Sequence, residues 1–394
     1  MTTSPMKVAH LCLSNFYIDG VAYQENELVR AHLAAGHDVV VIASTENFDA
    51  ERQLTYVEPG RYLGADGAPV IRLPYRRWLP HAVARKIRSY VGLKALLDEV
   101  DPDAIVFHSL AAWELLVVSR YKRDHPHVIV NVDSHEDFNN SARHRPGRLL
   151  HRYFYGPIVR RSRNITVPAL CISIETMDFV MDMYGLRSDE VEFFPLGGTV
   201  VADDEYAEYR RAARTSGGFG DDDIVLVQSG KFVPGKRLMQ TLRAFSTVDD
   251  PCLRLVIAGT IPPEDEDAFM LLIEADARIS FLGWQSAEEL KRLLYAADVY
   301  LQPGTQSVTM QASLCARCPI AVEDVPSHRP FVRGNGWFAH DEETIAAVLH
   351  EIVDDPDRLA TMSTISAEVA AELLDYRKLA ERALTDRQPE VGHS

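Results

Sequence analysis

The chain has 394 residues, which is comfortable for two domains, and its 46% hydrophobic and 25% charged residues are typical of a globular protein. Its formal net charge of −16 argues against nucleic acid as the main partner. No apolar run approaches the roughly 18 residues that a membrane-spanning helix needs. The first residues lack the apolar stretch and small-residue cleavage site of a signal peptide, so we do not expect secretion. Five scattered cysteines fit a reducing compartment, so we expect a cytoplasmic protein.

The first residues alternate between strand and helix patterns. Residues 8–13 are apolar and predict a strand, residues 23–35 predict a helix that ends at Gly36, and residues 38–43 predict a second strand. A strand–helix–strand unit of this length predicts a parallel sheet. The turn after the first strand ends at Gly20 and lacks a Gly-x-Gly-x-x-Gly pattern, which counts against a dinucleotide oxidoreductase.

Two polar clusters follow later strands of this half. Further strands are predicted over 104–107, 128–132, 165–167, 170–173 and 191–194. His108 ends the first of these strands, and the sequence DSHED, which contains His135, ends the second. Because open α/β sheets bind ligands at the carboxyl ends of their strands, His135 is a candidate site residue. A purely structural role for this histidine is the alternative.

The second half restarts the alternation after a break. The sequence PLGG at 195–198 interrupts the pattern, and residues 202–223 are interpreted as a helix-containing linker into a second domain. Ser286 and Glu289 form a predicted capping box. Strands are predicted over 224–228, 253–258 and 279–282, and helices over 342–353 and 356–373. We therefore predict an α/β protein with two doubly wound domains.

The stretch from Asp298 to Ala321 carries a candidate anion site. A buried strand over 298–301 is followed by a turn of small residues, a helix with Ser307 as its N-cap, and a strand that begins at Ile320. Such a turn brings backbone N–H groups and the positive end of a helix dipole together, which suits a phosphate. An ordinary strand-to-helix turn without a ligand is the alternative. The CxxC pair at Cys315 and Cys318 has no second ligand pair at zinc spacing, so no metal site is predicted.

Three motifs of the second half occur in the order and spacing of a known family. The segment GKFVPGKR places Gly230, Lys231 and Lys236 as in the family's Gly-Arg-Leu-x-x-x-Lys-Gly signature, and Phe281 to Gly283 matches its strand-Leu-Gly segment. Residues 303–319 resemble its Pro-Ser-x-x-Glu and Glu-Ala segment. Together they resemble the GT-B nucleotide-sugar glycosyltransferases, specifically the retaining family 4. The resemblance covers residues 191–340 well and the N-terminal part more weakly.

The resemblance implies both a fold and an activity. The fold is GT-B: two Rossmann-like domains that face across a cleft, an acceptor-side domain over 1–197 and a donor domain over 198–370, with a tail over 371–394 that can pack back on the first. The activity is transfer of a sugar from a nucleotide-sugar donor to a glycan, lipid-linked or small-molecule acceptor, retaining and without a metal or cofactor. A nucleotide-sugar 2-epimerase and a non-catalytic nucleotide-sugar-binding or partner subunit are the alternatives.

The same resemblance implies roles for individual residues. Lys231 and Lys236 would stabilise negative charge on the departing diphosphate, unless they are merely solvated loop lysines. His135 would donate to that phosphate or bind the sugar, with His108, Glu136 and Asp137 as acceptor-side candidates. Trp284 would lie near the nucleobase, with a purely structural packing role as the alternative. The full donor set is Gly20, Gly230, Gly259, Gly283, Trp284, Gln306, Ser307, Val308, Thr309 and Gln311.

Two features depart from the family or add to it. Gln306 and Gln311 stand, at shorter spacing, where the family carries two glutamates; because amides are neutral, we expect unusual donor choice or a binding-only protein. The stretches Arg72–Lys94 and Arg143–Arg163 each hold seven basic residues, no acidic residue and several aromatic ones. They predict a peripheral contact with anionic membrane, with a solvated face or an anionic-acceptor patch as the alternatives.

Overall fold

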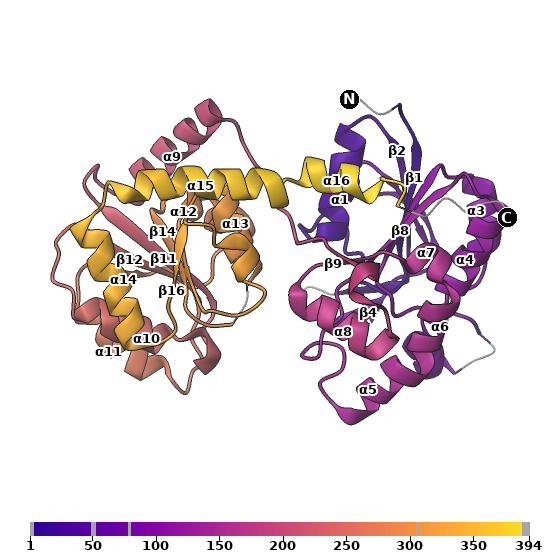
Figure 1. Ribbon diagram of the computed structural model, residues 1–394, viewed down its shortest axis with the longest axis horizontal. Helices are drawn as coiled ribbons and strands as arrows, with labels where there is room; N and C mark the ends of the chain where they lie inside the picture. The colour runs from indigo at the N-terminus through magenta and orange to yellow at the C-terminus, as the bar shows by residue number, and fades with distance from the viewer. Residues whose placement is uncertain (1–3, 49–52, 78–79, 306, 388–394) are drawn as a thin grey trace. The chain divides into compact units, whose positions relative to one another are not determined.

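The computed structural model describes residues 4–48, 53–77, 80–305 and 307–387. The chain forms two compact units, one made of Met1–Pro195 with Tyr376–Ser394 and the other of Leu196–Asp375. Each unit consists of a twisted sheet with helices on its faces (Figure 1). The predicted α/β class with two doubly wound, Rossmann-like domains is therefore confirmed.

The sheet of the first unit has the order β10-β9-β8-β7-β1-β2-β6-β5. All neighbours are parallel except β5, which pairs antiparallel with β6. The strands are β1 (Lys7–Cys12), β2 (Asp38–Ala43), β5 (Gly60–Leu63), β6 (Pro69–Arg72), β7 (Ala104–His108), β8 (Ile129–Ser134), β9 (Ala169–Cys171) and β10 (Val191–Phe193), and β3 (Glu46–Phe48) pairs separately with β4 (Leu54–Tyr56). The central strands are buried along nearly their whole length, as expected for a parallel sheet covered on both faces.

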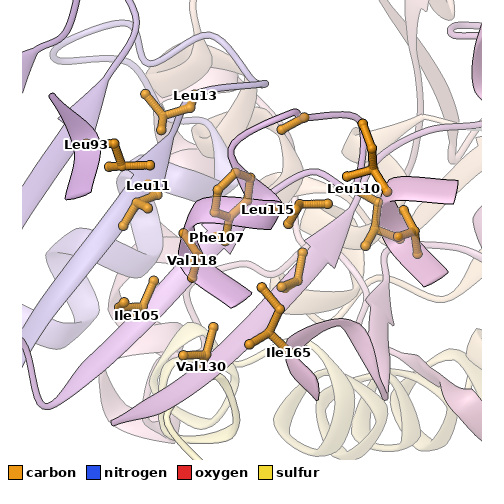
Figure 2. Packing of buried hydrophobic residues seen from close by; sticks show 14 of the residues in the cluster. Leu11, Leu13, Leu93, Ile105, Phe107, Leu110, Leu115, Val118, Val130 and Ile165 are labelled. Carbon is orange, nitrogen blue, oxygen red and sulfur yellow. The ribbon is translucent and has the colours of Figure 1, made fainter. Parts of the chain in front are cut away.

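Helices cover both faces of this sheet. They are α1 (Gln24–Ala34), α2 (His81–Ile87), α3 (Leu93–Val100), α4 (Leu115–Asp124), α5 (Arg145–Leu150), the π-helix η1 (His151–Tyr155), α6 (Gly156–Arg161), α7 (Arg163–Thr166), α8 (Ile174–Tyr184), the 3-10 turn η2 (Ser188–Glu190) and α16 (Tyr376–Ala383). Leu11, Phe107 and Leu115 belong to the core between β1, β7 and α4 (Figure 2). This core fixes the strand ends that carry the candidate histidines.

One predicted strand of this unit is wrong. Residues 165–167 were expected to extend the sheet, but Arg163–Thr166 forms the short helix α7. Ile165 is buried in the core, and the Thr166 hydroxyl donates to the carbonyls of Val159 and Ser162. A short β-branched run is compatible with either structure, and the helical turn prevails here because it satisfies the buried hydroxyl.

The sheet of the second unit is wholly parallel, in the order β13-β12-β11-β14-β15-β16. Its strands are β11 (Ile224–Lys231), β12 (Leu253–Thr260), β13 (Ile279–Phe281), β14 (Val299–Gln302), β15 (Ile320–Val322) and β16 (Gly336–Phe338). Its helices are α9 (Asp203–Gly217), α10 (Leu238–Ser246), α11 (Glu266–Glu274), α12 (Ala287–Ala296), α13 (Val308–Cys315), α14 (Glu342–Asp354) and α15 (Arg358–Leu373), with 3-10 turns η3 (Pro234–Lys236) and η4 (Arg329–Phe331). The predicted N-caps Ser286 and Ser307 are confirmed.

The helix expected within the segment over 202–223 is present: it is α9, in which Arg210 and Arg214 both bond Asp298 just before β14. One expectation for the second unit is corrected. Strands β11 and β12 continue past their predicted ends to Lys231 and Thr260. They do so because two glycines pair there; a Cβ on Gly259 would lie 1.8 Å from the carbonyl oxygen of Gly230.

Helix α16 is tied to the first unit by buried polar bonds. The ring of His32 on α1 bonds the carbonyl oxygen of Ala380 at 2.9 Å. The side-chain amide of Asn131, on β8, donates to the carbonyls of Ala383 and Thr385. Residues 388–394 of the expected tail lie outside the described residues. Across the described part of the chain, no helix has the length and apolar character needed to cross a bilayer.

Candidate functional site

The carboxyl edge of the first sheet holds a buried acid between two histidines. Asp133 near the end of β8 is 1% exposed. Its Oδ2 lies 2.5 Å from His108 Nδ1, its Oδ1 accepts the Ser109 N–H at 3.0 Å, and the same oxygen lies 3.5 Å from His135 Nε2. Parallel strands β7 and β8 bring these residues together because His108 is in register with Asp133. One carboxylate therefore serves both histidines.

His135 is held as a cation by this arrangement. Burial alone would lower its pKa, but the negative charge of Asp133 outweighs burial and raises the pKa to about 9, with smaller contributions from Glu25 and Glu136. Burial likewise acts to raise the pKa of Asp133, yet His108 and His135 hold it well below its usual range. The His135 side chain is 21% exposed, and its Nε2 is buried with no hydrogen-bond partner among the described residues. A charged donor thus stands at the ligand edge of the sheet.

The neighbouring acids support the loop around His135. Glu136 accepts from the hydroxyls of Ser109 and Ser134 and from the backbone N–H groups of Ala111 and His135. Asp137 accepts from two backbone N–H groups of the following turn. Both carboxylates therefore orient the loop that carries His135.

Two other predicted residues of this unit have clear positions. His108 is wholly buried, so the expectation that it contacts an acceptor directly is corrected to a position behind Asp133. Gly20 has a positive φ of 75° in the loop after β1, which is held by a bond from the Ala65 N–H to Asp19. That loop leads into α1, whose Glu25 bonds Asn15 and raises the pKa of His135.

The charge on His135 predicts how the stability of the fold depends on pH. Its pKa in the fold is about 9, against an ordinary value of 6.5, so its charge stabilises the fold below pH 6.5 and that contribution is lost as the pH rises through 9. We expect the free energy of unfolding, measured by urea titration, to fall by about 3 kcal/mol over this window. The His135→Gln variant should show a flatter profile; parallel profiles would contradict the assignment.

The second unit holds a lysine clasp at the carboxyl edge of its sheet. Lys236 Nζ donates to the Thr305 carbonyl at 2.8 Å, and Gln302 donates to the same oxygen at 2.7 Å. The Thr305 N–H in turn donates to Gly235. The backbones are so close that a Cβ on Gly304 would lie 2.0 Å from the Gly235 oxygen. Burial lowers the pKa of Lys236, so the ammonium is partly stripped of water and ready to pair with an anion.

Helix α13 begins beside this clasp. The Ser307 hydroxyl caps it by accepting from the Thr309 N–H at 3.2 Å, so that N–H is not free for a phosphate as expected. Val308 is exposed at the first turn, and the Oε1 of the nearly buried Gln311 has no hydrogen-bond partner among the described residues. Gln306 lies outside the described residues. The helix dipole and the Lys236 ammonium remain as anion-attracting features.

The other predicted donor residues lie along the same edge. Gly230 and Gly259 face each other across β11 and β12, and the Gly259 N–H donates to Gly283 at 2.7 Å. Trp284 follows with 54% of its surface exposed, so it is not a core residue. Lys231 is also exposed, at the end of β11. The predicted donor residues described in this unit therefore gather at one sheet edge, where a nucleotide would bind.

Sequence reasoning missed the residues behind His135. His10 and His32 extend the polar cluster from His108 into the interior, and all three rings are buried. His10 lies within the apolar run of β1 and His32 within the apolar stripe of α1, so neither stands out by pattern. Asp133 was visible only as the first letter of DSHED. Nothing in the local sequence shows that these residues meet.

Comparisons with known proteins bear on the family and the fold of the chain. Residues 18–197 match the family model described as Glycosyltransferase Family 4, and residues 210–368 match that of Glycosyl transferases group 1. No curated protein sequence matches the chain.

Solved structures of low identity share the fold. A glycosyltransferase from Rickettsia africae superposes with a TM-score of 0.66 at 9% identity, covering 97% of each chain. The sucrose-phosphate synthase of Thermosynechococcus elongatus gives 0.62 at 14% identity, covering 95% of this chain and 96% of its own. Anabaena HepE in complex with UDP gives 0.60 at 14% identity, covering 96% and 98%. With the two family matches and this shared fold, the chain belongs to the GT-B glycosyltransferases of the family 4 type.

Proposed function

We propose that this glycosyltransferase binds a nucleotide-sugar donor in its second unit and transfers the sugar to a glycan, lipid-linked or small-molecule acceptor. The observation that carries the proposal is the clasp of Lys236 and Thr305, which holds an ammonium beside the N-terminus of α13. A diphosphate gains negative charge as its bond to the sugar breaks, and a fixed cation lowers the energy of that state. Anabaena HepE, of the same fold, binds UDP in its crystal structure.

The chemistry can proceed with the chain's own cations. Lys236 and the exposed Lys231 supply positive charge to the diphosphate. The family resemblance gives the cationic His135 a hydrogen bond to the leaving phosphate or to the sugar. We propose retention of configuration, because of the family 4 resemblance, and independence of a metal, because these side chains can balance the leaving group. In such a reaction the departing phosphate itself can accept the proton of the acceptor hydroxyl.

The test of donor binding is thermal unfolding with a panel of nucleotides and nucleotide sugars, without added metal. A ligand at about 100 times its dissociation constant adds roughly 2.7 kcal/mol of stability. Stabilisation by one base and one sugar is the expected result. If none stabilises the protein, we would conclude that the two glutamines in place of the family's glutamates prevent donor binding, and the non-catalytic subunit would be favoured. Conversion of the donor without any acceptor would instead identify a 2-epimerase.

We propose further that the first unit docks on an anionic membrane. The two basic stretches meet in the fold, because the Tyr155 hydroxyl donates to the Lys86 carbonyl. Trp113 bridges them as well: its backbone N–H donates to the Ile87 carbonyl, and its ring stacks on Phe154 at 6.1 Å between ring centroids. Exposed apolar side chains accompany them, including Tyr153 at 71% and Leu149 at 57%. The patch consists of five exposed basic residues of the two stretches: Arg77, Lys86, Arg143, Arg145 and Arg161. Four other exposed ones are engaged within the protein: Lys94 and Arg152 pair with Asp98 and Asp182, and Arg148 and Arg160 donate to carbonyl groups.

Not every basic residue of the two stretches belongs to this patch. Arg72 is buried and donates to the carbonyls of Ser44 and Tyr17. Arg88 pairs with the buried Glu46, and Arg163 pairs with Glu190. Trp78 and Leu79 lie outside the described residues. The sequence therefore overestimates the charge that can reach a membrane.

The membrane proposal predicts salt-sensitive sedimentation with anionic liposomes. Each basic residue near the surface contributes about 1 kcal/mol, so Lys86→Ala with Arg145→Ala should weaken binding about 30-fold. The control is Arg211→Ala, an exposed arginine of α9 in the second unit, which should bind like the unaltered protein. Absence of binding at low salt would contradict the proposal.

A further inference from the structure

Behind Asp133 a line of three buried histidines runs through the first unit. His32 Nε2 lies 2.9 Å from the Ala380 carbonyl oxygen, and His32 Nδ1 lies 2.9 Å from His10 Nε2. His10 Nδ1 lies 3.0 Å from His108 Nε2, and His108 Nδ1 lies 2.5 Å from Asp133 Oδ2. The three rings are at most 1% exposed. The chain therefore runs without a gap from helix α16, through α1, β1 and β7, to Asp133 on β8.

Burial lowers the pKa of His32 and of His10, and with both rings neutral only one direction of donation is possible along this chain. A carbonyl oxygen can only accept, so His32 Nε2 must carry the proton and its Nδ1 must accept from His10. His10 Nδ1 then accepts from His108 Nε2, which leaves His108 Nδ1 facing a carboxylate. The four hydrogen bonds of the chain need four protons, whereas three neutral rings carry only three. The fourth proton lies between His108 and Asp133.

We propose that His32, His10 and His108 are positioning residues, a one-way hydrogen-bonded chain that holds this fourth proton against Asp133 and so sets how much of its charge reaches His135. The role of His135 at the leaving phosphate rests on the proposed function above; the protonation of the chain does not. Because Asp133 shares its charge between His108 and His135, loss of the proton at His108 leaves more negative charge for His135.

The titratable groups around the three histidines fit this distribution of protons. Burial lowers the pKa of His10 well below its usual value and that of His32 to about 4, so both rings are neutral, as the chain requires. His37 faces His32, and Cys12 lies near Asp133, with burial raising the pKa of its thiol. Glu25 and Glu136 face His135, and Arg72 faces Cys12. Among these groups, His108 is the ring that directly bonds the Asp133 carboxylate.

The first measurement uses the unaltered protein with nitrogen-15-labelled histidine. Ring-nitrogen NMR shifts should show His32 and His10 as neutral Nε2–H tautomers and His108 protonated on both nitrogens at neutral pH. A His10 ring protonated on Nδ1, or a His108 ring with one proton, would overturn the proposal. No variant has to fold for this result to be read, and no activity is needed.

The second measurement breaks the chain at one ring. His10→Phe removes the acceptor for His108 Nε2, so His108 should lose a proton and the pKa of His135 should rise by about one pH unit in an NMR titration. His10→Asn retains an acceptor oxygen near the Nδ1 position and should restore the unaltered value. His125→Gln, at a ring bonded to Tyr121 away from the chain, is the matched control.

The outcomes separate this proposal from the proposed function. A folded His10→Phe protein with an unchanged His135 pKa would overturn the role of the chain, even if nucleotide sugars bind. The expected shifts in a protein that binds no nucleotide would support the chain and contradict the glycosyltransferase mechanism. If His10→Phe does not fold, the tautomers of the unaltered protein still decide the proposal.

Discussion

Replacing Lys236 with alanine is expected to weaken nucleotide-sugar binding about 100-fold, as measured by calorimetry or by loss of thermal stabilisation. Truncating one side of a buried, hydrogen-bonded charge pair with a phosphate costs 2–5 kcal/mol or more. The Lys236 ammonium is held in place in the donor domain by its 2.8 Å bond to the Thr305 carbonyl. The fold should survive, because Gln302 and Gly235 still bond Thr305 after the substitution.

The matched control is Lys291→Ala, an exposed lysine of α12 in the same unit, which should bind the donor unchanged. Lys236→Arg keeps the charge but cannot reproduce the compact ammonium in the clasp, so an intermediate affinity is expected. Equal affinity in the Lys236→Ala and Lys291→Ala proteins would show that the diphosphate binds elsewhere.

The parts of the site that sequence could locate are those with a local signal. Ser286 and Ser307 begin helices because their hydroxyls cap backbone N–H groups within the same few residues. His135 could be placed at a strand end because an apolar run precedes it. The lysine motif could be found because its residues lie within one short segment, 230–237. Each of these signals depends on neighbours in the sequence.

The parts that sequence missed depend on residues far apart in the chain. His32 and Ala380 are 348 positions apart, and His10 and His108 are 98 apart, so no periodicity relates them. Helix α10 begins at Leu238, and the preceding Arg237 is in a left-handed conformation and provides no side-chain cap, so the helix carries no start signal. For the same reason the sequence does not show that Arg72 is buried, since the carbonyl groups to which it donates lie on other segments of the chain.

Asp133→Asn is expected to lower turnover about 100-fold at neutral pH while the fold is kept. The asparagine amide can donate to His108 Nδ1 and its oxygen can accept from the Ser109 N–H, so the histidine chain stays satisfied without its fourth proton. His135 then loses its anionic partner, and burial lowers its pKa against only the smaller contributions of Glu25 and Glu136. At neutral pH the ring is no longer a cation, and a positioned acid is worth 10²–10⁴ in rate.

Because Asp133 acts through His135, the two substitutions should not add. Release of nucleoside diphosphate by Asp133→Asn, by His135→Gln and by the double variant should fall to about the same level. Asp103→Asn provides the matched control, since its carboxylate accepts the Lys7 N–H at the amino end of the same sheet, away from the site. That variant should retain full turnover. If the losses of Asp133→Asn and His135→Gln multiply in the double variant, Asp133 contributes independently of His135, and the shared-charge arrangement is wrong.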